Sequence, residues 1–301
     1  MMRLALALAA GVCCAAPAAA QEYVLAMTYE TGTEGGADGA SSAASGRQAI
    51  AERVLALTLE GAELEYTLPS DPEEVRGNAR WMFPARVRVV GDGSMALLNA
   101  DELTARADAW LAEMEWPREV CSRWTFSWAA YQIRCDAAAA VETVESYGMQ
   151  PGRIAAGQPF ALKGALGPVV LERSGEAEGR VILTGSGPVD VAFLREEDTR
   201  AALVVAEVGR EALTPEAAAA ASAAIAATGT VSVTFAVDAA GMVWRREDVS
   251  DYTMTGSRWR DGHTRARTTV TRLTRAEWER QQAEREAEED RAEPLADPAS
   301  R

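Results

Sequence analysis

The stretch TVSVTFAVDAAGMVWRREDVSDYTMTG, residues 230–256, carries the clearest structural signal in the chain. Large apolar side chains alternate with small ones over residues 231–237, which is the pattern of a strand with one buried face. Residues 238–241 favour a tight turn, and residues 242–254 continue as a long polar strand. Together they predict a β-hairpin in an antiparallel sheet that has one buried and one wet face.

Similar patterns predict further strands on the N-terminal side of this hairpin and after it. Near the N-terminus Tyr23, Leu25, Met27 and Tyr29 alternate, and they should point the same way. Residues 54–68 should form two strands: Leu55, Leu57 and Leu59 share one face of the first, and Leu64, Tyr66 and Leu68 share one face of the second. Other strands are expected at 86–99 (a hairpin), 158–194 (several short strands), 201–208 and 264–273.

Helix signals lie between these strands. Asn99 with Glu102, and Thr274 with Glu277, have the spacing of a capping box. Helices are expected over 100–111, from Asp136 to Tyr147, from Thr214 to about Ala227, and from Arg275 to about Glu293, with a short one after Ser70. Because strands and helices come in blocks, the sequence predicts an α+β fold: curved antiparallel sheet packed on a few helices, with a charged C-terminal helix.

The hairpin at 230–256 and the order sheet, helices, sheet resemble periplasmic half-barrel proteins of the lipoprotein-carrier type. In those proteins a curved antiparallel sheet wraps around helices. The resemblance implies such a sheet here. No functional residue is carried over from it.

The first twenty residues have the order of a secretory signal peptide. Arg3 precedes an apolar run, small residues follow, and an A-x-A site ends at Ala20. We expect cleavage there and a secreted or periplasmic protein. The alternatives are a retained anchor and, through Cys13 or Cys14, a lipoprotein. No later apolar run is long enough to span a bilayer.

The charge of the chain limits its partners. A net charge of −15 disfavours nucleic acid and anionic lipid surfaces. Cleavage leaves two cysteines, Cys121 and Cys135, which should form a disulfide in an oxidising compartment. With a single histidine in the chain, a structural zinc site is disfavoured, and no motif predicts a metal or cofactor.

Few catalytic arrangements fit the sequence, and we assign no catalytic residue. His263 is the single histidine and lies in an expected exposed turn at residues 261–264, and no G-x-S-x-G motif occurs. Lys163 is the single lysine and lacks a preceding S-x-x-K. Residues 184–188 are glycine-rich and indicate a tight turn. Carboxylate pairs remain as candidates for a hydrolase, among Glu60, Glu63 and Glu65, or Asp248 and Asp251.

Aromatic residues concentrate over residues 110–131. A strand would place Trp124, Phe126 and Trp128 on one face. Two interpretations are open: a ligand pocket lined by Trp110, Trp124, Phe126 and Trp128, or the core where a helix docks on the sheet. We favour the core.

These observations predict three parts: a signal peptide at 1–20, a globular region at 21–273 that divides into halves 21–150 and 151–273, and a charged helix and tail at 274–301. The expected function is binding or scaffolding in the cell envelope, without catalysis. The ligand would be an apolar small molecule, or the C-terminal helix would contact an envelope protein. The alternative is a periplasmic hydrolase that uses paired carboxylates.

Overall fold

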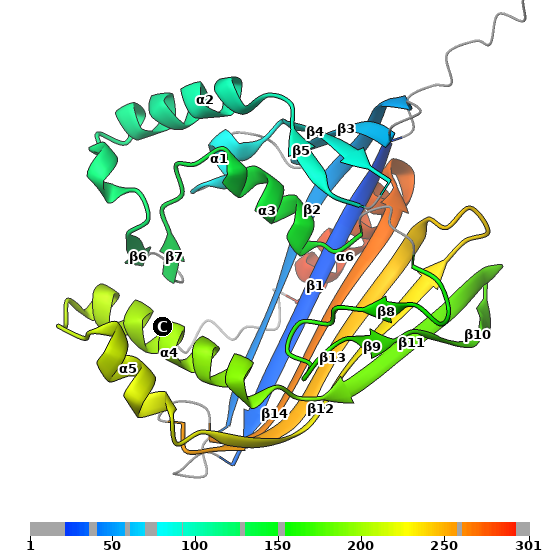
Figure 1. Cartoon of the computed structure of the whole chain (residues 1–301). Coiled ribbons are helices and arrows are strands. Elements are labelled where there is room, and N and C mark those ends of the chain that lie inside the picture. Colours follow the sequence, from blue (N-terminus) through cyan, green and yellow to red (C-terminus); the bar gives the residue numbers. More distant parts are fainter. Residues whose placement is uncertain are drawn as a thin grey trace, which may run out of the picture.

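Ten antiparallel strands form one large open sheet, with long strands that bend toward one end (Figure 1). The computed structural model describes residues 22–35, 41–57, 61–69, 77–91, 93–126, 130–149, 154–257 and 261–292. The expected signal peptide and the expected helix after Ser70 lie outside these residues. The fold is α+β, as the sequence predicts.

The sheet order joins the end of the chain to its beginning. From one edge to the other it runs β10 (Glu172–Ala177), β11 (Arg180–Pro188), β12 (Ala226–Val237), β13 (Val243–Thr255), β14 (Gly262–Thr274), β1 (Glu22–Glu34), β2 (Ser42–Leu57), β3 (Gly61–Thr67), β4 (Ala85–Val90) and β5 (Met95–Leu97). Because β14 pairs with β1 from Tyr23 to Glu34, the two halves of the chain share one sheet. Two small hairpins lie apart from it: β6 (Trp124–Phe126) with β7 (Ala130–Gln132), and β8 (Pro159–Phe160) with β9 (Val169–Val170).

Five helices lie on one face of the sheet, which we call the inner face, and one lies on the outer face (Figure 1). The inner-face helices are α1 (Ala79–Met82), α2 (Ala100–Glu113), α3 (Ala138–Ser146), α4 (Val191–Gly209) and α5 (Pro215–Ser222). Helix α6 (Arg275–Ala292) contacts β1 and β14 on the outer face, where Val24 and Leu273 are buried. Among the described helices, none has the length and apolarity to cross a membrane.

Alternating side chains build the core as the sequence predicts. Val231, Val233, Phe235 and Val237 of β12 are all buried in the main core. The inner face of the other strands and the apolar sides of α2 and α3 complete it; the contributors include Leu25, Ile50, Leu64, Tyr66, Leu103, Trp110, Val144, Tyr147 and Val270. Burying one such side chain stabilises the fold by about 1.5–3 kcal/mol.

One strand prediction is wrong. Residues 201–208 belong to α4, because Asp190 caps that helix by accepting a hydrogen bond from the Ala192 N–H, and helical geometry continues to Gly209. Leu55 and Leu57 lie in strand β2, as expected, and both are exposed, by 42% and 80%. An irregularity in the pairing with β3 falls between Val54 and Ala56.

One helix prediction also needs correction. The alanine-rich helix begins at Pro215 with a Thr214 cap, as expected, but it ends at Ser222. Strand β12 then starts at Ala226, because pairing with β13 takes over from the helix. The Thr274–Glu277 capping box at the start of α6 forms as expected, with the Thr274 N–H donating to Glu277 Oε2 at 2.8 Å.

The expected Cys121–Cys135 disulfide is present, with the two Cα atoms 5.7 Å apart. The chain folds back between them through β6 and β7, as the short sequence separation of 14 residues requires. Replacing both cysteines with serine is expected to lower the free energy of unfolding by about 3 kcal/mol, because the bridge restricts the unfolded chain. Urea unfolding of the oxidised protein and of the double variant measures this difference. Equal midpoints for the two proteins would contradict it.

A buried ion pair crosses the inner face between β2 and β14. Arg272 Nη2 lies 3.0 Å from Glu52 Oε1, and the two residues are only 4% and 5% exposed. The Tyr66 hydroxyl donates to Glu52 Oε2 at 2.9 Å, and the Arg272 guanidinium also donates to the carbonyls of Val243 and Met149. Arg272 Nε is buried and has no hydrogen-bond partner among the described residues. Since the two charges are paired with one another and sealed from solvent, this cluster has a structural role.

The buried Tyr66 phenol should make the free energy of unfolding fall at alkaline pH. Burial raises its pKa well above the usual range, and the Glu52 carboxylate raises it further. Above about pH 10 tyrosines ionise in the unfolded chain while Tyr66 stays neutral in the fold, so its contribution to stability is lost as the pH rises. The usual pKa of tyrosine is about 10. We therefore expect the Tyr66→Phe variant to show a smaller fall in melting temperature than the wild type between about pH 9 and about pH 11. The matched change at exposed Tyr29 should leave that fall unchanged, and equal slopes in both variants would refute the assignment.

Candidate functional site

Three hollows of similar volume lie on the described part of the molecule. One is at the part of β11 beyond Thr184, where its pairing with β10 stops, one is on the outer face near the ends of β1 and β14, and one lies between α4 and the inner face. Their volumes are about 670, 770 and 750 Å³. Their walls differ in chemistry, and that difference decides which of them suits a ligand.

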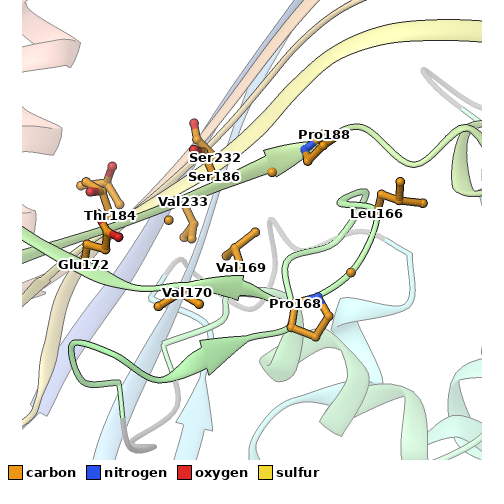
Figure 2. A pocket seen from close by; sticks show the side chains of 14 residues that line it. Leu166, Pro168, Val169, Val170, Glu172, Thr184, Ser186, Pro188, Ser232 and Val233 are labelled. Atoms are coloured by element: carbon orange, nitrogen blue, oxygen red, sulfur yellow. The ribbon is translucent and has the colours of Figure 1, made fainter.

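The hollow at the β11 edge is a packing feature (Figure 2). Val169 points toward β11, while the hydroxyls of Ser186 and Ser232 point to the opposite side of the strands. Gly185 and Gly187 leave room for the crossing segment: a Cβ on Gly185 would come within 2.9 Å of a Val169 methyl carbon. Residues 184–188 are therefore strand, and the tight turn predicted there is wrong, because the glycines serve this close approach.

The outer-face hollow is a charged, solvated strand surface. Across the β1–β14 ladder Glu30 is paired with Arg267 and Glu34 with His263. The turn predicted around His263 is wrong, because residues 262–274 form strand β14 and pair with β1; His263 Nε2 is 2.8 Å from Asp251 Oδ1 on the exposed face. Opposite charges facing one another across strands need no ligand to explain them.

The third hollow, which we call the α4 cavity, has an apolar helix on one side and the sheet on the other. Phe193, Leu194, Ala201 and Val205 of α4 line it. The opposite wall consists of small inner-face residues of five neighbouring strands, among them Val231, Ser250, Thr264, Ala266, Thr268, Thr31, Thr33, Ser42 and Ala44. Five strands at about 4.8 Å spacing span about 19 Å, so the cavity is elongated across the sheet.

A change in side-chain size along the strands creates this cavity. The inner face of β1 carries Leu25 and Met27 in or against the core, and then Thr31 and Thr33 in the cavity. In β14 the change is from Val270 to Ala266. Because helix and sheet keep their positions while the side chains shrink, space remains between them. The cavity is therefore encoded by the same alternating positions that build the core.

Polar contacts at three points fix α4 to neighbouring segments of the chain. Asp198 is 5% exposed and accepts hydrogen bonds from Ser222 Oγ at 2.9 Å and Ser257 Oγ at 2.6 Å. Arg195 donates twice to the Ile225 carbonyl. Near the C-terminal end, Glu207 accepts from the Arg123 guanidinium and from the Trp124 N–H. With its buried polar groups satisfied, the helix does not need to collapse onto the strands.

Two charged side chains line the α4 cavity, Lys163 and Asp248. The Asp248 carboxylate is 2.8 Å from Arg246 Nη2, so its charge is paired. The Lys163 Nζ lies 5.5 Å from the centroid of the Phe193 ring, and no ion pair joins it to a carboxylate of the described residues. The remaining polar groups are hydroxyls, including the Thr33–Thr264 pair at 3.2 Å.

The aromatic candidates lie elsewhere. Trp110 is buried in the core and stacks edge-on with Trp116. Trp124 is half-buried on β6 beside α4, and Phe126 is 64% exposed, so the predicted core role is wrong for Phe126. The hairpin carries Phe126 beyond the helices that were expected to cover it. None of these three lines the α4 cavity, and Trp128 lies outside the described residues.

The carboxylates considered for a hydrolase are not arranged as a catalytic pair. Asp248 lines the inner cavity, whereas Asp251 bonds His263 on the outer face. Glu63 and Glu65 each form an ion pair with an arginine, and Glu60 lies outside the described residues. Within the described chain, each carboxyl group with a resolved shift has a lowered pKa, because it accepts hydrogen bonds; these are Glu102, Glu207, Asp238 and Glu277. A general acid needs the opposite shift.

The described residues also contain no group of three or more His, Cys, Asp or Glu side chains that could hold a metal ion. Comparison of the chain with protein-family models and with curated proteins found no match. The α4 cavity is therefore interpreted from its own geometry and chemistry.

Proposed function

We propose that the protein is a carrier of the bacterial cell envelope that holds an apolar chain in the α4 cavity. The observation that carries the proposal is an elongated cavity of about 750 Å³ between the apolar side of α4 and small residues of the sheet. Small-molecule sites have about 300–1,000 Å³ and mainly apolar walls with a few polar groups. Each methylene moved from water into such a site contributes about 0.8 kcal/mol.

Two further observations support a place outside the cytoplasm. The first twenty residues have the pattern of a signal peptide, and a disulfide joins Cys121 to Cys135. We therefore place the carrier in the periplasm or among secreted proteins. Contact between α6 and an envelope partner stays a prediction.

A neutral apolar dye such as phenylnaphthylamine tests the proposal. Its emission should rise and saturate when the mature protein is titrated, because the dye enters a water-poor site. A long-chain alcohol should then displace it and return the emission to its starting value. A linear, unsaturable rise, or a dye that the alcohol does not displace, would argue against a carrier.

A further inference from the structure

We propose that the ligand of the α4 cavity carries an acidic headgroup, a carboxylate or a phosphate, that binds Lys163; this inference rests on the proposed function. Apolar walls alone would bind an alkyl chain whatever its headgroup. The two charged residues of the lining, however, are not equivalent. Asp248 is paired with Arg246, whereas the Lys163 ammonium is left with the Phe193 ring. The cavity therefore offers one positive charge for a ligand to neutralise.

The backbone holds Lys163 at one end of the cavity. The Gly164 carbonyl accepts a hydrogen bond from the Asp190 N–H at 2.8 Å, and Ala165 forms an antiparallel bridge with Val189 just before α4. Gly164 has a φ of +81°, a backbone conformation that favours glycine, and it lies beside the Phe193 ring, which a Cβ there would meet at an ordinary contact distance of 3.4 Å.

This placement orients the ligand. Lys163, Gly164, Val189 and Phe193 lie beside Val231 of β12, at one side of the five strands that line the cavity. Thr33 and Ser42, on β1 and β2, lie at the other side. A headgroup at Lys163 directs its chain across the sheet, under Ala201 and Val205. The ammonium donates hydrogen bonds to the anionic oxygens, while the Phe193 ring faces the cation.

The nearby carboxylates do not oppose this assignment. Asp190 is occupied as the cap of α4, and its Oδ1 accepts the Ala192 N–H at 2.8 Å. Asp248 shares its charge with Arg246 at hydrogen-bonding distance. Although the chain has a net charge of −15, this end of the cavity presents an ammonium group to the ligand.

Titration calorimetry with ligands that have the same alkyl chain and different headgroups tests the proposal. The probes are a long-chain carboxylate, the phosphate monoester of the same chain and the corresponding alcohol, each below its micellar concentration; acetate and inorganic phosphate are the heads alone. The wild type should bind one or both acids about tenfold more tightly than the alcohol, since a hydrogen bond to a charged group contributes that much. The preferred acid identifies the headgroup.

Variants assign the preference to Lys163. In Lys163→Gln the acids should bind no better than the alcohol, and the affinity for the alcohol should stay unchanged; Lys163→Arg should keep the preference. Arg200→Gln, which removes an exposed cation of α4 outside the cavity, is the matched control and should bind like the wild type.

The two proposals fail in different ways. Equal affinity for acid and alcohol in the wild type, or an acid preference that survives in Lys163→Gln, would overturn the headgroup assignment and leave the carrier intact. If none of the ligands with an alkyl chain binds, the proposed carrier function is overturned. Binding of acetate or inorganic phosphate as tight as that of the chain-bearing acids would also overturn the headgroup proposal, because it would show a site for a free anion.

Discussion

Replacing Arg272 with alanine is expected to lower the free energy of unfolding by about 3–5 kcal/mol. The guanidinium pairs with Glu52 where both groups are almost fully buried, and it also satisfies the Val243 and Met149 carbonyls. Without the guanidinium, the Glu52 carboxylate stays buried and charged, and its remaining hydrogen-bond donor is the Tyr66 hydroxyl. Urea unfolding at neutral pH measures the loss.

Two controls separate the buried charge from the lost side-chain volume. Arg272→Met combined with Glu52→Leu replaces the pair with apolar groups and should recover most of the lost stability. Arg53→Ala breaks an ion pair with Glu65 on the outer face, and it should change stability by less than about 1 kcal/mol. The interpretation is wrong if Arg272→Ala is as mild as Arg53→Ala, or if the double variant is no more stable than Arg272→Ala.

Ala201→Phe is expected to weaken binding of an apolar ligand by at least about tenfold, because it fills part of the cavity that the ligand would occupy. Ala201 lies on the cavity side of α4, among its apolar residues. The dye titration of wild type and variant measures the effect. Circular dichroism melting shows whether the variant remains folded.

Ala202→Phe is the matched control for this prediction. Ala202 is the next residue of the same helix, is also half-buried, and does not line the cavity. Its variant should bind the dye like the wild type. Equal loss of binding in both variants would mean that a general disturbance of α4, and not occupation of the cavity, explains the result.

Much of the architecture follows from periodicity. The alternation in residues 231–237 and the caps at Thr214 and Thr274 predict elements that the structure contains. Periodicity failed where a local event changed it. The run at 201–208 is as apolar as a strand, although the Asp190 cap and tertiary packing make it helix.

The candidate site was harder to predict for the same reason. The strand that the sequence predicts at 201–208 provides no helix to form one wall of a cavity. The change from Leu25 and Met27 to Thr31 and Thr33 along β1 was a readable signal, but its meaning depends on α4 lying opposite. Lys163 stands out in the sequence as the single lysine, and only the fold places it beside Phe193.

Native mass spectrometry tests most directly whether the α4 cavity holds an apolar chain. The mature protein, exported by a bacterial host and purified without detergent, is measured as isolated and after incubation with a long-chain alcohol. We predict one bound chain per polypeptide in at least one of the two samples, retained in Ala202→Phe and lost in Ala201→Phe. Wild-type protein that shows only the mass of the polypeptide in both samples would contradict the account.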